Sequence, residues 1–200
     1  CTASASIEVF VNPVPVANSS TNSPQCQNSN LILSASGGET YSWSGPGLVS
    51  NLDTVLMQNV QPVQSGIYIV TVVNNFGCTV LHFHTVTVDS LPLVSCTSDS
   101  IACIGSDLHL FTSAGASYNW SGPGGFLSSL QNPVINNADS NATGIYSVNV
   151  FNAQNCSASA SMSVAMTTPV QVFTTAQQTT ICEGTSTQLS ANIGSVENYS

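Results

Sequence analysis

Seven cysteines are the residues of this chain whose type and spacing most clearly predict chemistry. Six recur at matched places of a repeated pattern, three before one kind of strand and three before another: Cys1, Cys78, Cys156 and Cys26, Cys103, Cys182. Buried free thiols would not need to recur in this way, so the pattern predicts disulfides made in an oxidising compartment. Cys96 has no counterpart. It is a free thiol, a partner for a neighbouring protein, or an alternative partner for Cys103, and these options stay open.

Three histidines are the next candidates. His82 and His84 lie two apart on one predicted strand and so project from one face, a spacing that can hold a metal ion. Self-alignment sets them opposite Ala160 and Met162, which face the core, and no third or fourth ligand is evident. We therefore expect a structural role for this pair. His109 falls on an outward position, where we expect it to be solvated.

No catalytic arrangement can be singled out. No serine or cysteine nucleophile has a repeatable base partner, and the acidic residues form neither a calcium-type loop nor a carboxylate pair for glycoside hydrolysis. We predict no enzyme activity, no metal and no cofactor. Leu81 and Phe83 point outward where the other repeats have serine. They form a contact patch, or the strand has a shifted register, and both interpretations stay open.

The elements that position these residues belong to a repeat of about 78 residues. Its clearest marker is Tyr-x-Trp-Ser-Gly-Pro-Gly, which contains Trp43 and, in the next copy, Trp120. We expect a third copy to begin at residues 198–200, just before the sequence ends. Tyr68 and Tyr146 also recur, each after Ser/Thr-Gly-Ile. Repeats of this kind define domain boundaries before any fold is argued.

The repeat divides the chain into four parts: 1–13 as the last strand of one unit, 14–90 and 91–168 as whole units, and 169–200 as the first strands of another. We take the chain as an excerpt from a longer polypeptide. Short alternating runs between Gly, Pro, Asn and Ser turns predict about seven strands per unit and no helix. In the first whole unit they are 14–19, 30–36, 40–44, 47–50, 54–60, 67–73 and 78–88. The expected fold class is all-β, with tandem antiparallel sandwiches.

The composition excludes several partners. The chain has no lysine or arginine, 4% charged residues and a net charge of −9. Nucleic-acid binding requires cations that neutralise phosphate, and a polybasic membrane patch requires them too. With 42% hydrophobic residues the chain can still bury a core. No run of residues is long enough to span a membrane.

These units resemble immunoglobulin-like domains. Trp43 and Trp120 occupy the third strand, where such domains bury a tryptophan, and Tyr68 and Tyr146 resemble the tyrosine corner of the sixth strand. One departure is that valine (Val70 and Val148) stands two residues after each tyrosine, where antibody domains have a cysteine. The resemblance therefore implies a core without the inter-sheet disulfide.

The pattern Cys-x-Gly-(polar)-x-x-Leu, Tyr-x-Trp-Ser-Gly-Pro, Gly-x-Tyr-x-Val, Gly/Asn-Cys also resembles repeats of giant surface adhesins of Bacteroidota. Proteins of that family leave the cell through the type IX system, and some serve gliding motility. The resemblance implies an extracellular, cell-surface location. It implies neighbouring repeats, the secretion machinery and an unknown surface or polysaccharide ligand at a distal region as partners.

The immunoglobulin-like topology constrains the disulfides. Cys26 would lie at one end of the sandwich and Cys78 at the other, roughly 23 Å apart along a strand. A disulfide spans only about 4.4–6.8 Å between Cα atoms. We therefore expect Cys26 to bond Cys156 across a junction of units. Cys1, Cys78, Cys103 and Cys182 would pair with repeats outside the excerpt, which would turn beads into a rod.

Asp-Ser/Thr followed by an aliphatic residue occurs three times and resembles the O-glycosylation signal of Bacteroidota. The candidate acceptors are Thr54, Ser90 and Ser100. Glycans there would solubilise a surface with few charges. Coincidence in a Ser/Thr-rich chain is the alternative.

Three functions follow from these observations. The first is a rod-like stalk segment of a very long exported adhesin that projects a binding tip and transmits force. The second is a structural subunit of an extracellular filament or sheath. The third is a run of spacer or sugar-binding modules in a secreted enzyme.

Overall fold

The computed structural model describes residues 1, 3–99 and 102–193. Within these residues the chain forms two compact units. The first comprises Cys1–Leu93 together with Phe151–Ala158, and the second comprises Val94–Val150 together with Ser159–Ser200. The four sequence ranges, 1–13, 14–90, 91–168 and 169–200, stay a prediction, because the compact units divide the chain in a different way.

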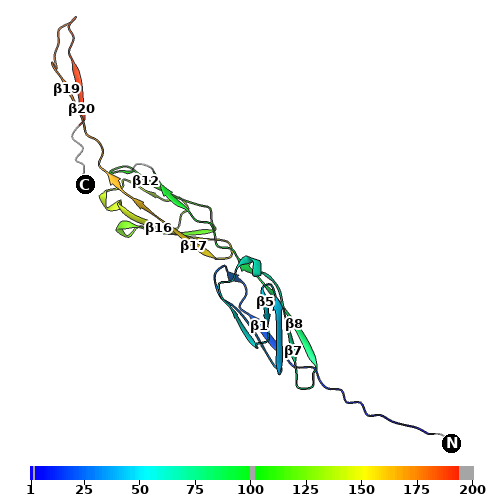
Figure 1. Ribbon diagram of the computed structural model, residues 1–200. Helices are drawn as coiled ribbons and strands as arrows, with labels where there is room; N and C mark the ends of the chain where they lie inside the picture. Colours follow the sequence, from blue (N-terminus) through cyan, green and yellow to red (C-terminus); the bar gives the residue numbers. More distant parts are fainter. Residues whose placement is uncertain (2, 100–101, 194–200) are drawn as a thin grey trace. The chain divides into compact units, whose positions relative to one another are not determined.

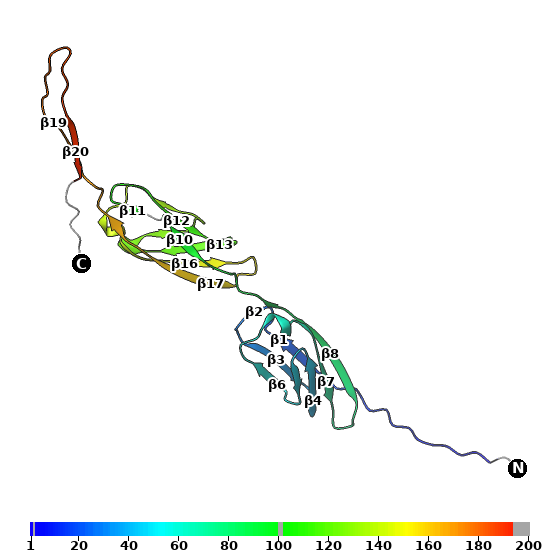
Figure 2. The same ribbon diagram turned by 45° about the horizontal axis from the view of Figure 1, so that its top comes forward.

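The first unit consists of short strands and one turn of 3-10 helix (Figure 1). Its elements are β1 Asn18–Thr21, β2 Gln25–Cys26, β3 Leu31–Ser36, β4 Thr40–Gly45, β5 Leu48–Ser50, β6 Thr54–Met57, η1 Pro62–Gln64, β7 Gly66–Val73, β8 Thr79–Val86 and β9 Val88–Asp89. One sheet has the order β1-β3-β6 and the other β5-β4-β7-β8. Figure 2 shows them as two layers, with β1, β3 and β6 in one and β4, β7 and β8 in the other.

A short parallel pair closes one edge of the first unit. Strand β2 pairs with β9, in the register Gln25↔Val88 and Cys26↔Asp89, whereas the other pairs are antiparallel. The sequence placed the first strand at 14–19, but β1 begins only at Asn18. Pro13 and Pro15 have no amide hydrogen for a ladder, which explains why the strand begins after them.

The second unit has the same arrangement. Its elements are β10 Cys96–Ser98, β11 Ala102–Cys103, β12 Leu108–Thr112, β13 Ser117–Ser121, η2 Pro123–Gly125, β14 Leu127–Ser128, β15 Val134–Ile135, η3 Ser140–Ala142, β16 Gly144–Phe151, β17 Ser157–Val164, β18 Met166–Thr167, β19 Val172–Ala176 and β20 Leu189–Ile193. The sheets are β10-β12-β15 and β14-β13-β16-β17, and β11 pairs with β18 in parallel. This is the immunoglobulin strand order, with the fourth strand of the constant type absent. The fold is all-β and immunoglobulin-like.

A tryptophan between the sheets forms the centre of each core. Trp43 and Trp120 are buried, and so are Val70 and Val148, the valines found in place of the inter-sheet cysteine. Other fully buried side chains of the two cores are Leu31, Leu33, Tyr68, Val72 and Leu108, Leu110, Tyr146, Val150. Burial of apolar side chains, without an inter-sheet disulfide, therefore holds each sandwich together.

Tyr68 and Tyr146 form tyrosine corners. The Tyr68 hydroxyl lies 2.8 Å from the Pro46 carbonyl oxygen and 2.9 Å from that of Gln64. The Tyr146 hydroxyl donates to the carbonyl of Ala142 at 2.9 Å. Burial raises the pKa of both phenols, so they stay protonated donors at neutral pH.

The hairpin β19–β20 corresponds to the pair β1–β3, but its register is shifted by one residue. Leu189 and Leu33 each lie seven residues after a cysteine, Cys182 and Cys26. Leu189 pairs with Ala176, six residues before Cys182, whereas Leu33 pairs with Thr21, five residues before Cys26. Residues 198–200, where the sequence suggested a third copy of the tryptophan motif, lie outside the described residues.

Candidate functional site: the cysteine joint

One disulfide is present among the described residues, and it joins Cys26 to Cys156, the two cysteines named as partners from the sequence. Their Cα atoms are 5.6 Å apart, within the usual range for a disulfide. Cys156 is buried, and both residues belong to the first compact unit. We call this disulfide, with the turn at 26–29, the hairpin at 152–156 and the Ser90 carbonyl, the cysteine joint.

A tight turn presents Cys26. The Cys26 carbonyl accepts hydrogen bonds from the backbone amide of Ser29 at 3.1 Å and from its hydroxyl at 2.6 Å. Asn28 between them has φ 68°, a left-handed conformation that asparagine tolerates better than most residues. Because the carbonyl is held twice, the side chain of Cys26 leaves the turn in a defined direction.

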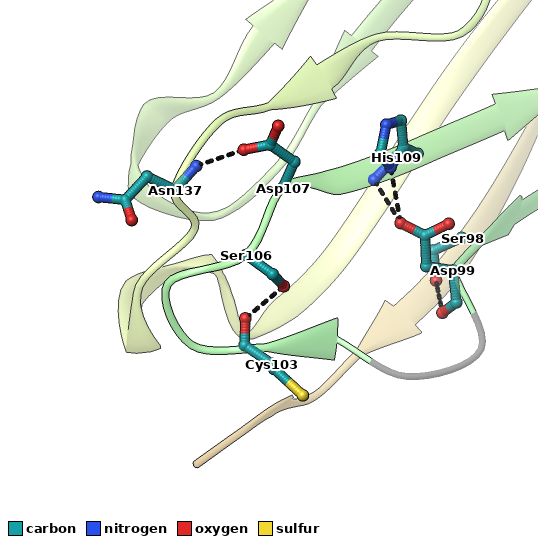
Figure 3. Close-up of polar contacts among 7 residues, drawn as sticks. All are labelled: Ser98, Asp99, Cys103, Ser106, Asp107, His109 and Asn137. Carbon is teal, nitrogen blue, oxygen red and sulfur yellow. Dashed lines mark hydrogen bonds and ion pairs between the residues drawn. The ribbon is translucent and has the colours of Figure 1, made fainter. Parts of the chain in front are cut away.

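The same turn recurs at the two other cysteines of this class. The Cys103 carbonyl accepts from the Ser106 amide at 3.1 Å and from its hydroxyl at 2.7 Å. The Cys182 carbonyl accepts from Thr185 in the same two ways, also at 3.1 Å and 2.7 Å. Figure 3 shows the Cys103 sulfur pointing away from Ser106. Both cysteines are free thiols, so these two turns present a sulfur without a disulfide, whereas the sulfur of Cys26 has one.

A five-residue hairpin presents Cys156. Asn152 closes it, because its backbone amide donates to the Cys156 carbonyl at 2.9 Å and its Oδ1 accepts from the amides of Gln154 at 3.1 Å and Cys156 at 2.9 Å. Asn74 does the same in the hairpin of Cys78. It donates to the Cys78 carbonyl at 3.1 Å and accepts from the amides of Phe76 and Cys78 at 3.0 Å each.

Each asparagine also reaches beyond its own hairpin. Asn152 Nδ2 donates to the Ser90 carbonyl at 2.9 Å, and Asn74 Nδ2 donates to the Pro13 carbonyl at 2.8 Å. Ser90 lies one residue after β9, and Pro13 holds the corresponding place when Cys1 is aligned with Cys78. Neither asparagine was predicted as a site residue from the sequence. The repeated spacing Asn-x-x-x-Cys is the signal that identifies them.

Cys78, the counterpart of Cys156, is a free thiol. Its sulfur is 3.7 Å from the Asn12 carbonyl oxygen, and Asn12 aligns with Asp89, the residue that pairs with Cys26. Cys78 therefore lies where a turn cysteine would meet it. Cys1, Cys103 and Cys182 are also free.

Cys96 lies on β10 and packs partly buried against the second core. Burial raises the pKa of its thiol, which keeps it protonated and weakly reactive. In the shared strand register Cys96 takes the place of Ser19, since each pairs with the residue two positions after an equivalent leucine of β3 or β12.

His82 and His84 point inward on β8 and share one hydrogen-bond partner. The Ser19 hydroxyl lies 2.8 Å from His82 Nδ1 and 2.7 Å from His84 Nε2. One hydroxyl hydrogen can serve only one ring nitrogen, so Ser19 donates to one histidine and accepts from the other. Burial lowers the pKa of His84, and the neighbouring His82 lowers it further. The described residues contain no group of three potential metal ligands.

Leu81 and Phe83 are exposed on β8, in the burial alternation that the serines of β17 also follow. The register of β8 is therefore not shifted. His109 is exposed, as expected, but it also has a partner that the sequence did not suggest. Its ring Nδ1 and its backbone amide each lie 2.9 Å from one Asp99 carboxylate oxygen (Figure 3). The amide and then the ring lower the pKa of Asp99.

The glycosylation candidates Thr54 and Ser90 are exposed. Ser100, the third candidate, lies outside the described residues. Within the described part of the chain no helix is long and apolar enough to cross a membrane.

No protein-family model and no curated protein matches the chain. Solved structures do match. Three N-terminal domains of the bacteriophage RB49 Highly Immunogenic Outer Capsid protein share 18% identity, with a TM-score of 0.40, over 92% of this chain and 70% of that one. Murine CEACAM1b shares 12% identity, with a TM-score of 0.41, over 76% of this chain and all of that one. The insect immune protein hemolin shares 16% identity, with a TM-score of 0.42, over 78% of this chain and 47% of that one. At such low similarity the strand order of the chain itself carries the fold assignment.

Proposed function

We propose that the chain is a structural stalk segment of a long exported protein, in which cysteine joints tie successive immunoglobulin-like sequence repeats together. The observation that carries this proposal is the recurrence of both halves of the joint. The turn of Cys26 recurs at Cys103 and Cys182, and the hairpin of Cys156 recurs at Cys78. Of these turns and hairpins, only the Cys26 turn and the Cys156 hairpin are joined to each other by a disulfide.

In this proposal Cys103 bonds the hairpin cysteine of a following repeat, and Cys78 bonds the turn cysteine of a preceding one. Cys182 and Cys1 pair in the same two directions. Each joint limits the hinge between units, so that the array is a rod that holds a distal binding region away from the cell and transmits force. Disulfides of this kind persist in an oxidising, extracellular compartment.

The resemblance to giant adhesins of Bacteroidota supports a cell-surface location, type IX export and a role in adhesion or gliding. It rests on the repeat motifs alone. Glycans on Thr54, Ser90 and Ser100 belong to the same proposal. An intact mass of the native protein equal to that of the bare polypeptide would exclude them.

The test is non-reducing peptide mapping of the native, exported protein. We expect a peptide containing Cys103 to be linked to the Asn-x-x-x-Cys hairpin of the next repeat. Linkage of Cys26 to Cys78, or of Cys103 to Cys182, would contradict the proposal. Electron micrographs before and after reduction supply the mechanical part, and we expect straight particles to become flexible when the joints are reduced.

A filament or sheath subunit is the second candidate. The exposed pair Leu81 and Phe83, at 50% and 64% exposure, favours it, because apolar side chains on an outer sheet face can pack against another chain. Ordered lateral contacts between particles in the same micrographs would support this function over a single stalk.

A further inference from the structure

The hairpin asparagine of the joint makes two kinds of contact with one side chain. Its Oδ1 holds the hairpin closed through two backbone amides, while its Nδ2 donates outward to the Ser90 carbonyl. The first contact is local. The second joins residues that are 62 apart in sequence, and it fixes the hairpin against the chain that leaves β9.

Strand β9 is also the strand that positions Cys26. Because Cys26 pairs with Asp89, the residue just before Ser90, the outward bond of Asn152 brings the Cys156 hairpin to the place where the Cys26 turn is held. The outward bond of Asn152 and the Cys26–Cys156 disulfide therefore hold the same hairpin against the same part of the chain.

The hairpin of Cys78 makes the outward asparagine hydrogen bond although its cysteine has no disulfide. Asn74 donates to the Pro13 carbonyl at 2.8 Å, and the Cys78 sulfur beside it is a free thiol, 3.7 Å from the Asn12 carbonyl oxygen. A hairpin of this kind can therefore make the contact while its cysteine is still a thiol. Where both bonds form, each favours the other, because both hold the hairpin against the chain after β9.

We infer that Asn152 and Asn74 are positioning residues of the cysteine joint. Each holds its hairpin cysteine in place for a disulfide by donating a hydrogen bond to a backbone carbonyl, that of Ser90 just after β9 or that of Pro13 at the corresponding place. The inference rests on the proposed function, because it assigns to Asn74 the role in a joint with a preceding repeat that Asn152 has here. The partner of each hairpin should therefore have two features: a cysteine in a turn, and beside it a backbone carbonyl that can accept the asparagine hydrogen bond.

The reaction that reads out this role is thiol–disulfide exchange. The thiols of Cys26 and Cys156 reduce one molecule of oxidised glutathione, which leaves the protein disulfide and two molecules of reduced glutathione. Its equilibrium constant measures how well the folded chain holds the two sulfurs together. Loss of one hydrogen bond should lower this constant roughly two- to tenfold.

The experiment uses the full chain, with the five free cysteines changed to serine so that only Cys26 and Cys156 exchange. Cys96→Ser introduces the residue that Ser19 represents in the other unit. In this background Asn152→Asp and Asn152→Ser both keep an oxygen that can accept from the hairpin amides, and both remove the Nδ2 donor. Asn74→Asp is the matched control, since it makes the same change in a hairpin whose cysteine is no longer present.

We expect both Asn152 variants to lower the glutathione equilibrium constant roughly fivefold and Asn74→Asp to leave it within about twofold. Hydrogen exchange of the Gln154 and Cys156 amides should stay slow. An unchanged constant in the Asn152 variants would overturn the inference. So would a fall in Asn152→Asp alone, which would indicate a charge effect, or a loss of amide protection, which would indicate an opened hairpin.

This result is independent of the mapping of the native protein. If Cys103 proves unlinked to a following repeat while both Asn152 variants lower the constant, the stalk proposal fails and the positioning role of Asn152 remains. If the mapping succeeds and the constant is unchanged, only the asparagine inference fails.

Discussion

The equivalent strands β8 and β17 have the same burial pattern but different side chains. Their inward positions hold His82 and His84 in the first unit and Ala160 and Met162 in the second. The facing strand differs correspondingly. Ser19 bonds both histidines in the first unit, whereas Cys96, like Met162, packs against the second core. A polar group of three in one unit thus corresponds to an apolar group of three in the other.

This difference teaches which parts of the fold are fixed. The buried tryptophan, the leucines of β3 and β12 and the tyrosine corner are the same in both units. The three positions near the first strand accept either a polar set (serine with two histidines) or an apolar set (cysteine with alanine and methionine), provided that all three side chains are of the same kind. A histidine there needs a hydrogen-bond partner, because a buried polar group without one is costly. Four predictions test this comparison. Replacing the two tryptophans with fluorotryptophan places one fluorine NMR signal in each unit, so the unfolding of each unit can be followed separately.

The largest expected effect concerns the shared core. Leu33→Ala and Leu110→Ala each remove a fully buried side chain at equivalent positions, so each should lower the unfolding free energy of its own unit by about 3 kcal/mol. Denaturant titration followed by fluorine NMR measures both units at once. Losses that differ by more than about 1 kcal/mol would show that the two cores are not equivalent.

The tyrosine corners should differ slightly. Tyr68→Phe removes a hydroxyl that lies near two carbonyl oxygens, whereas Tyr146→Phe removes one that has a single carbonyl partner. We expect losses of about 1.5 and 1 kcal/mol respectively. The same titration measures them, and a larger loss for Tyr146→Phe would reverse the expected order.

The histidines make the first unit sensitive to acid. The pKa of His84 is lower in the folded than in the unfolded chain, so the folded state binds protons less well, and stability falls as pH drops below the unfolded value near 6.5. Because His84 is partly exposed, the loss between pH 7.5 and 5 should be roughly 0.5 kcal/mol. The triple change Ser19→Cys, His82→Ala and His84→Met gives the first unit the side chains found in the second. It should abolish the pH dependence of unfolding measured at the Trp43 signal. Dependence that survives this transfer would assign it to other groups.

The smallest effect is expected on the outer face of the sheet. Leu81→Ser with Phe83→Ser copies the serines found in the second unit and should change the unfolding free energy by about 0.5 kcal/mol or less. Sedimentation velocity of the same variant tests the filament alternative. Loss of self-association on this change would favour lateral packing, and an unchanged monomer would leave the stalk proposal as the simpler account.

Much of the fold could be predicted from the sequence, because the repeat of about 78 residues and the alternation of apolar and polar residues are strong signals. Trp43 and Tyr68 recur at fixed places, and the position of the tyrosine corner follows from them. The first strand was misplaced by several residues, since proline removes ladder donors in a way that hydrophobic alternation does not reveal. Ser19, Asp99 and Asn152 were missed because their hydrogen bonds join residues far apart in sequence or depend on the geometry of a turn. Only the asparagine has a repeated spacing that could have revealed it.

The Cys26–Cys156 bond spans 130 positions of sequence, which gives the chain an unusual response to tension. A pull applied at the two ends passes through the sulfurs and bypasses the residues between them. About 450 Å of extended backbone is thereby kept out of the load path. In an optical trap the oxidised chain should stop lengthening early and gain this hidden length only after reduction. The disulfide thus fixes how far the chain can be stretched, separately from how stable its units are.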